Sequence, residues 1–521
     1  MRFTRILAAF LAFVLVASLA ACSLVGDAPQ GTDTNDPQLR ETDPTVSGNE
    51  TVGTDRATDP VEEPDNTNPE DYSQETTEAT EPERDHRVEE DEEEIQEDED
   101  FDPDDLDQDG NGGFGSDGAV EEQTKDDSGD ETGTSTSTYA ARPLSWDNIN
   151  SFPIKASSMS VAQLRQLCVD YFRYAKTATW TPSTSVNFIR NAKGANDSMI
   201  GGNTYGGLPY IGLGSGTMYR LLDYMDPATG VVDMADALKL GGTISMADMK
   251  YFGNQCANGA FSGWGRVINS VSRTSTANMV KRNGYIPLGS YTYKDVKNWS
   301  TSYQTKQVCA ENGPQVMYEA YAKLQIADGM VYYTTAGHVI MASSVPVVKR
   351  NGDGTIDGNA SYVYIIDQAQ SWEDYTTIGG STCKIKNSVD AKKTFAELYN
   401  RYYLPFTFGE FQGTDPVQST FCSFGFDREV ITPEELFGNE VSANYFISDA
   451  YVILTDSGDS QVYKHAVRGG AANCFNLSLS RTGKNVDSWG TFPTSGSYNV
   501  EIIVQLYTGE RVSVYTGILK V

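Results

Sequence analysis

A cysteine that follows a glycine-rich loop has the setting that thiol chemistry needs. Cys256 lies in FGNQCANGAFSGWGRVINSV, where Gly, Asn and Gln precede it. The residues after it, including Ala260, Phe261 and Trp264, have the apolar spacing of a helix. This pattern predicts a thiol at a helix N-terminus, where exposed N–H groups and the macrodipole lower its pKa and favour the nucleophilic thiolate.

A histidine that can serve this thiol stands at the start of an apolar segment. The chain has three histidines, and His338 lies in TTAGHVIMASS, directly after an Ala-Gly step. An imidazole at a strand entrance can maintain a thiolate as an ion pair and act as base and then acid. His86 falls in a segment without apolar periodicity, and His465 in VYKHAV has no evident partner, so we expect His465 to be structural.

A third polar group should orient the imidazole. NGDGTIDGN has the composition of a hairpin turn, and folding 338–349 back on 361–370 brings the end of IIDQAQ near His338. We choose Asp367 for this role, with Gln370 as the alternative, because a carboxylate fixes the tautomer and stabilises imidazolium. The backbone N–H of Cys256, aided by Gln255, is the expected oxyanion donor.

These residues together resemble a known superfamily. NQC before a helix, GHVIMAS and IIDQAQ look like the cysteine, histidine and acidic or amide blocks of the NlpC-type and CHAP-type cysteine peptidases and amidases, which cut peptide bonds in bacterial cell walls. TYGGLPYIG looks like their aromatic-glycine segment, which makes Tyr210, or as a second choice Tyr205, a candidate for the substrate side. The resemblance covers roughly 200–370 and implies a papain-like fold and a thioester mechanism.

Other functions remain open at this stage. Six cysteines besides Cys22 allow fifteen disulfide pairings, so Cys256 could be half of a disulfide or a buried core residue. A catalytically inactive member of the fold could bind peptide or glycan at a surface, and a transglutaminase-like acyl transferase would keep the same order of residues. No metal cluster, phosphate-binding glycine loop or basic nucleic-acid patch is apparent, so we expect no metal, cofactor or nucleic acid.

The N-terminus has the marks of export. Arg2 and Arg5 precede an apolar run at 6–21, which is typical of a secretion signal and too short to cross a bilayer convincingly. LAAC at 19–22 resembles the bacterial lipobox, in which the signal is cut before a lipidated cysteine. We therefore expect residues 1–21 to be a signal peptide and Cys22 to anchor the chain to the extracytoplasmic face of the cell membrane.

An acidic segment follows the expected anchor. Residues 23–138 hold 40 Asp or Glu against 5 Lys or Arg, whereas 139–521 hold 32 of each kind. The segment lacks apolar periodicity and should be a disordered tether over 22–138. DLDQDG within it imitates a calcium loop, but Ser116 stands where the bidentate glutamate is required, so we interpret it as a solvated turn.

The remainder predicts an α+β protein in two parts. Residues 139–415 mix helical patterns, at 160–176 and 313–325, with strand patterns at 329–335, 337–348 and 362–370. Residues 420–521 consist of short strand patterns with Gly, Asn and Asp turns, which predict a small all-β sandwich. This second part resembles the immunoglobulin-like modules of bacterial surface proteins. Cys168, on the apolar face of the first helix, is expected to be a core residue.

Overall fold

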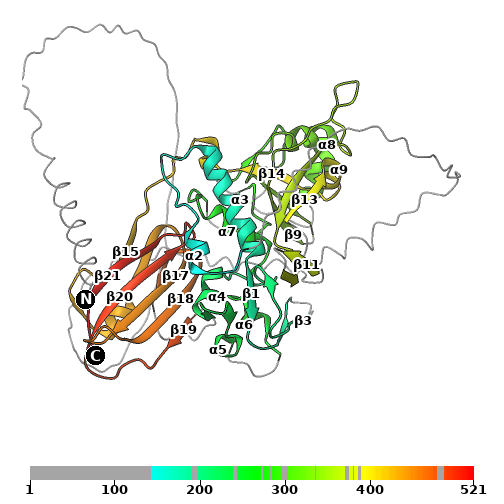
Figure 1. The fold of residues 1–521 in the computed structure, drawn as a ribbon. Coiled ribbons are helices and arrows are strands. Elements are labelled where there is room, and N and C mark those ends of the chain that lie inside the picture. The colour runs from blue at the N-terminus through cyan, green and yellow to red at the C-terminus, as the bar shows by residue number, and fades with distance from the viewer. Residues whose placement is uncertain are drawn as a thin grey trace, which may run out of the picture. The chain divides into compact units, whose positions relative to one another are not determined.

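The computed structural model describes most of the chain from residue 142 onward. The described residues are 142–190, 194, 196–238, 243–271, 274–281, 284–294, 303–334, 336–369, 375–378, 381–384, 389–477 and 486–521. The predicted signal peptide, Cys22, the acidic tether with its DLDQDG turn, and Gln370 lie outside them. The predicted α+β class is confirmed, because helices and several sheets share the described part (Figure 1).

A six-stranded sheet forms the centre of the first part. Its strand order is β13-β10-β9-β8-β14-β7, and its ladders are antiparallel. The strands run over β7 Ile286–Pro287, β8 Gly329–Tyr333, β9 Gly337–Ala342, β10 Tyr362–Asp367, β13 Val389–Thr394 and β14 Leu404–Thr407. The predicted strand at 337–348 therefore ends early, since Ser343–Val348 belong to the connection that returns the chain to β10.

Helices cover both sides of this sheet. Figure 1 shows α3 and α7 on one side and α8 and α9 on the other. The helices are α2 Trp146–Asn150, α3 Val161–Thr177, α4 Met218–Asp223, α5 Met234–Leu238, α6 Met246–Met249, α7 Cys256–Trp264, α8 Thr305–Tyr321, α9 Phe395–Asn400, α10 Gly409–Gln412 and α11 Pro433–Gly438. The prediction for 160–176 matches α3, whose N-cap Ser160 forms a capping box with Gln163.

The second predicted helix was placed too late in the sequence. A helix was expected to begin at Gly313, but α8 begins at Thr305 and ends at Tyr321. Gly313 has φ 75° and marks a kink, after which Pro314 begins the second helical stretch. Glycine and proline side by side resemble a helix boundary, whereas here they bend a helix that is already under way.

Small sheets complete the first part of the chain. One has the order β4-β1-β6-β5, and two are hairpins, β2-β3 and β11-β12. Their strands run over β1 Thr179–Pro182, β2 Val186–Ile189, β3 Asn196–Met199, β4 Tyr205–Gly206, β5 Met225–Asp226, β6 Val231–Val232, β11 Tyr375–Ile378 and β12 Ser381–Lys384.

The C-terminal part is built on strands, as predicted, with α11 as an addition. Its strands join one seven-stranded sheet ordered β16-β21-β20-β17-β18-β19, with β15 paired to β17. They run over β15 Cys422–Phe424, β16 Val430–Ile431, β17 Glu440–Thr455, β18 Gln461–Asn476, β19 Val486–Trp489, β20 Ser497–Leu506 and β21 Arg511–Lys520. Bulges interrupt β17 between Ser442 and Asp449. The two-sheet, immunoglobulin-like arrangement stays a prediction.

The two parts share a core. Phe446 and Tyr507 of the C-terminal sheet belong to the apolar cluster of the first part, and the ring of Phe446 packs edge-on against Phe261 of α7 at 5.1 Å. A buried ion network joins the same parts, since Arg468 of β18 contacts Asp223 at 2.8 Å and Asp487 at 2.7 Å. The C-terminal sheet is therefore packed into the fold, in contrast to a loosely appended module.

Candidate active site

Cys256 is the first residue of α7. Gln255 is the N-cap, with extended backbone (φ −94°, ψ 178°). The loop before it is held by backbone pairing, because Asn254 forms bridges with both Tyr210 and Ser215. As the predicted pattern required, the thiol stands at the positive end of a helix dipole, on a loop that is fixed from two sides.

Two glycines let α7 lie close to its neighbours. A Cβ on Gly259 would be 2.5 Å from the Cβ of Gln368, and one on Gly263 would be 2.8 Å from the carbonyl oxygen of Cys168 in α3. Both distances are shorter than any ordinary contact. These glycines therefore set how close Cys256 comes to the end of β10, where Gln368 follows Asp367.

His338 and Asp367 meet across neighbouring strands. β9 and β10 are antiparallel, with Asp367 opposite Ile340, and the Nε2 atom of His338 lies 3.1 Å from Oδ2 of Asp367. The carboxylate can only accept, so Nε2–H donates and Nδ1 is left for the thiol side. The predicted fold-back of the chain therefore brings these two residues together. Gly337 makes room for this, since a Cβ there would collide with the side chain of Thr276.

The thiol and the imidazole form the third contact. The pKa of His338 responds to hydrogen bonding with Cys256 as well as with Asp367, and the Cys256 thiol also lies 4.0 Å from the carbonyl oxygen of Gly337. Burial disfavours the imidazolium, but these two hydrogen bonds and the nearby negative charges outweigh it and raise the pKa of His338 to about 9. The side chains of His338 and Asp367 are each 14% exposed. At neutral pH the imidazole is therefore held in its protonated form beside the sulfur.

An oxyanion donor is available at the same place. The N–H of Cys256 has no intrahelical partner, as expected for a first helical residue, and none elsewhere in the described part of the chain. The backbone N–H of Gln255 is bound to the carbonyl of Gly214 at 3.2 Å, so only its half-exposed side chain could assist. The geometry favours the Cys256 N–H as the donor.

The two candidate tyrosines have different settings. Tyr210 is half-buried and its backbone pairs with Asn254, two residues before Cys256. Tyr205 is 2% exposed, packs against Trp180, and its hydroxyl accepts a hydrogen bond from the N–H of Ile200 at 2.8 Å. Tyr210 therefore adjoins the cysteine loop, whereas Tyr205 is a core residue.

One of the two structural alternatives for Cys256, the disulfide, is excluded, whereas the other stays open because Cys256 is buried, with 3% of the residue exposed. Cys168, Cys256, Cys309, Cys422 and Cys474 are all free, so Cys256 is not half of a disulfide. Burial raises the pKa of the Cys309 thiol to about 12, and it raises that of Cys168 further. These two are inert core thiols, as predicted for Cys168.

His465 has the structural role expected of it. It is fully buried, its Nδ1 lies 3.0 Å from the hydroxyl of Ser488, and burial lowers its pKa to about 4. A neutral imidazole in the core of the C-terminal sheet is consistent with packing and not with catalysis.

Sequence reasoning missed two aromatic neighbours of the site. Tyr332 of β8 is the cross-strand partner of His338, and their ring centroids lie 6.3 Å apart. Tyr403, just before β14, packs edge-on against Tyr332 at 5.0 Å. The strand pairing of β8 with β9 would have indicated Tyr332, but the pairing with β14 joins segments about 70 residues apart and left no local signal for Tyr403.

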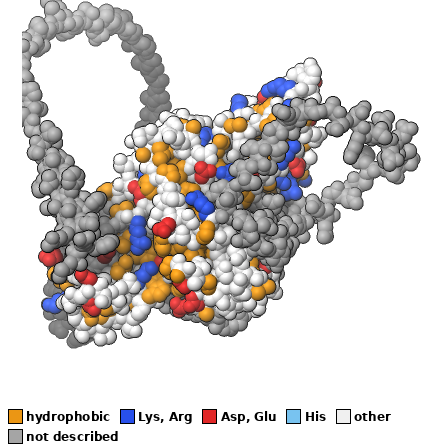
Figure 2. Space-filling model, viewed as in Figure 1, with side chains coloured by type: hydrophobic (Ala, Val, Ile, Leu, Met, Phe, Trp, Pro, Cys, Tyr) orange, Lys and Arg blue, Asp and Glu red, His pale blue; other side chains and the backbone are white. Residues whose placement is uncertain are grey.

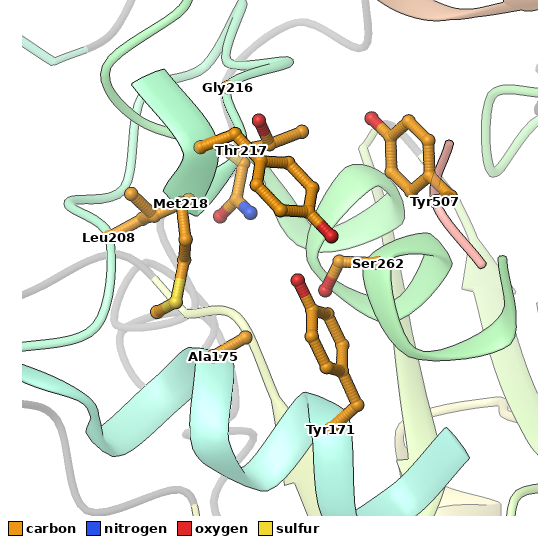
Figure 3. A pocket seen from close by; sticks show the side chains of 10 residues that line it. Tyr171, Ala175, Leu208, Gly216, Thr217, Met218, Ser262 and Tyr507 are labelled. Carbon is orange, nitrogen blue, oxygen red and sulfur yellow. The ribbon is translucent and has the colours of Figure 1, made fainter. Parts of the chain in front are cut away.

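Two cavities lie away from these three residues. The smaller, about 10 Å³ and thus room for roughly one water molecule, is lined by α3, α4 and α7 (Figure 3). The hydroxyls of Tyr171 and Ser262 point toward each other within it. The larger, about 380 Å³, is lined by residues of 149–154, by Arg266 and by the turn between β20 and β21.

Within the described ranges, no group of His, Cys, Asp or Glu side chains could hold a metal ion. The helices in those same ranges are too short or too polar to cross a membrane. No protein-family model matches the chain, and a search of curated proteins finds no relative.

Proposed function

We propose that this chain is a thiol hydrolase that cleaves peptide or amide bonds, with peptidoglycan stem peptides as its substrate class. The observation that carries the proposal is the line of contacts from Cys256 at the start of α7 through His338 to Asp367. The proposal includes a papain-like catalytic domain and an immunoglobulin-like module over 420–521. It also includes a lipid anchor at Cys22 on the extracytoplasmic side of a bacterial membrane.

The first chemical step is acylation of the thiol. The Cys256 thiolate attacks the carbonyl carbon of the scissile amide, and the Cys256 N–H receives the developing negative charge on the oxygen. The carbon–nitrogen bond then breaks as His338 gives its proton to the leaving amine. The products of this half-reaction are a free amine and a thioester on Cys256.

The second step returns the enzyme to its starting state. Neutral His338 takes a proton from water, the hydroxide oxygen attacks the thioester carbon, and the carbon–sulfur bond breaks. Asp367 remains an acceptor throughout, since its role is to hold Nε2–H and to stabilise the imidazolium. The carboxylic acid leaves, and the Cys256 thiolate and protonated His338 are restored.

Two other functions would use the same geometry. A transglutaminase-like enzyme would differ only in the acceptor, because an amine would take the place of water in the second step. An inactive binder of peptide or glycan would keep the fold without a reactive thiol. Neither alternative is favoured by a contact of its own, whereas the protonated His338 beside Cys256 favours a reactive thiol.

The test measures alkylation of individual cysteines in the full chain by mass spectrometry between pH 5 and pH 10. We expect Cys256 to react faster at pH 7 than the exposed Cys474, and to slow by at least tenfold in His338→Ala. Cys474→Ser is the matched control and should leave the Cys256 rate unchanged. Equal Cys256 rates in the parent chain and His338→Ala would refute the catalytic pair. Digestion of purified cell walls by the parent chain and by Cys256→Ala then separates a hydrolase from a binder.

A further inference from the structure

The catalytic residues continue into a row of side chains across the sheet. β10, β9, β8 and β14 are consecutive neighbours; the first three carry Asp367, His338 and Tyr332, and Tyr403 directly precedes β14. Each neighbour in the row touches the next, through the 3.1 Å hydrogen bond and ring separations of 6.3 Å and 5.0 Å. The row therefore leads from the reacting atoms to the turn between α9 and β14.

A half-buried cation, Arg401, lies at the end of this row. Arg401 is the C-cap of α9, two residues before Tyr403, and it is half-buried. Within the described residues its guanidinium makes no hydrogen bond and no ion pair. Burial is the main reason that the pKa of Tyr332 and of Tyr403 is raised, but the charge of Arg401 lowers both. Arg401 is thus within electrostatic reach of the two rings beside His338.

A second cation faces the ring of the residue that follows Arg401. Lys306 is the second residue of α8, is exposed, and holds its Nζ 5.7 Å from the ring centroid of Tyr402. A lysine in the first turn of a helix opposes the macrodipole, so this position is unfavourable for a purely structural residue. The hydroxyl of Thr305 accepts a hydrogen bond from the N–H of Tyr333, at 3.0 Å, which fixes this turn beside the end of β8.

Tyr402, which follows Arg401 in the chain and faces Lys306, has a strained backbone. Tyr402 has φ 62°, in the left-handed region that favours glycine. Its N–H is bound to the carbonyl of Tyr399 and that of Tyr403 to the carbonyl of Leu398, which is the hydrogen-bonding of a helix-ending motif whose left-handed residue is usually glycine. The chain keeps an aromatic ring at a position where glycine would be easier. Figure 2 shows Lys and Arg side chains at the end of the molecule that carries α8 and α9.

From these contacts we infer that Arg401 and Lys306, together with the ring of Tyr402 that Lys306 faces, form a subsite for a carboxylate of the substrate. The inference rests on the proposed function and narrows it: the peptide or amide that acylates Cys256 carries a negative charge near the bond that breaks. The planar guanidinium of Arg401 receives the carboxylate, and Lys306, which faces the ring of Tyr402, adds a second positive charge.

Paired alkylating reagents test this without knowledge of the substrate. Iodoacetate is an anion and iodoacetamide is its neutral counterpart, and both transfer a two-carbon group to a thiolate with loss of iodide. The measurement is the ratio of the two rates at Cys256 in the full chain, at pH 7 and low ionic strength. A nearby unit charge should change the ratio by about three- to fivefold, and added salt should shrink the change.

We expect the ratio of iodoacetate to iodoacetamide rates to fall in Arg401→Gln and further in Arg401→Gln combined with Lys306→Gln. Arg401→Lys should retain most of it. Lys520→Gln, which removes an exposed charge from the far C-terminal strand, is the control and should leave the ratio unchanged. An unchanged ratio in the double variant, with Cys256 still reactive, overturns the subsite alone. A Cys256 that is slow with both reagents and insensitive to His338→Ala overturns the proposed function instead.

Discussion

The Nε2 atom of His338 lies 3.1 Å from Oδ2 of Asp367, and this contact decides which ring nitrogen faces Cys256. Because Asp367 accepts from Nε2–H, Nδ1 is the nitrogen that can exchange a proton with the sulfur. The same contact is one of the two hydrogen bonds that raise the pKa of His338 against the opposing effect of burial.

Replacing the carboxylate of Asp367 should lower the pKa of His338 and so narrow the pH range in which the Cys256–His338 ion pair exists. In the parent chain the imidazolium persists until pH rises to about 9, the pKa of His338. In Asp367→Asn the histidine loses a negative neighbour, so its pKa falls and the ion pair with Cys256 is lost at lower pH. The measurement is the titration of the His338 ring protons by NMR between pH 5 and 10 in the parent chain and in Asp367→Asn. If the pKa of His338 stays near 9 in Asp367→Asn, its raised value is due to Cys256 and not to Asp367.

The same titration affects stability. The folded-state pKa of His338 exceeds its ordinary value of 6.5, so the native state holds the proton more tightly than the unfolded state. This stabilisation is complete below pH 6.5 and is lost as pH rises to about 9. A shift of that size corresponds to at most about 3 kcal/mol. Urea unfolding at pH 6 and pH 9.5 should show that His338→Gln loses more stability, relative to the parent chain, at the lower pH.

Gly259 should not tolerate a side chain. In Gly259→Ala the new Cβ would meet Gln368, and overpacking costs about 1–3 kcal/mol of unfolding free energy. The strand end that carries Asp367 should shift with Gln368 and slow Cys256 alkylation. Gly352→Ala is the control, because its Cβ would meet nothing within 4 Å and its backbone is not left-handed. Equal denaturation midpoints for the two variants would contradict the close approach.

Buried ion pairs should contribute more to the unfolding free energy than exposed ones. Arg468 is buried with Asp223, Asp449 and Asp487, and removing it in Arg468→Leu leaves three carboxylates in the core, which should cost about 3–5 kcal/mol of unfolding free energy. Arg428→Gln breaks an exposed pair with Glu435 and should cost less than about 1 kcal/mol. A small effect for Arg468→Leu in chemical denaturation would mean that the network is hydrated in solution.

Replacing Tyr402 by glycine should stabilise the fold but reduce the preference of Cys256 for an anionic reagent. Replacing it by glycine relieves a left-handed backbone and should raise the unfolding free energy by about 1 kcal/mol. The same Tyr402→Gly change removes the ring that Lys306 faces, so the preference of Cys256 for iodoacetate over iodoacetamide should fall. A variant that is less stable than the parent chain would show that the ring contributes more packing than its backbone costs.

Local sequence patterns were sufficient to predict the elements that carry Cys256, His338 and Asp367. Cys256 could be placed because a helix start has a sequence signature, and His338 and Asp367 because a polar turn joins two apolar strands. The start of α8 was missed because Gln304 caps it, a residue type that rarely marks a helix N-terminus, and because Gly313 and Pro314 resemble a boundary.

Features that depend on distant pairing could not be predicted. Tyr403 comes beside Tyr332 only because β14 pairs with β8, and Arg468 meets Asp223 across about 245 residues of sequence. The register of such pairs is set by the whole core, so no window of neighbouring residues contains it. The carboxylate subsite belongs to this class, since its residues come from α8 and from the end of α9.

The packing of Phe446 and Tyr507 links the completion of the core around α7 to the end of protein synthesis. Both belong to the core against which the rear of α7 rests, yet they are made long after Cys256. A growing chain emerges from its N-terminus, so a nascent chain shorter than about 500 residues holds the thiol without the packing that fixes its helix. The packing around Cys256 is therefore complete only when synthesis is almost finished.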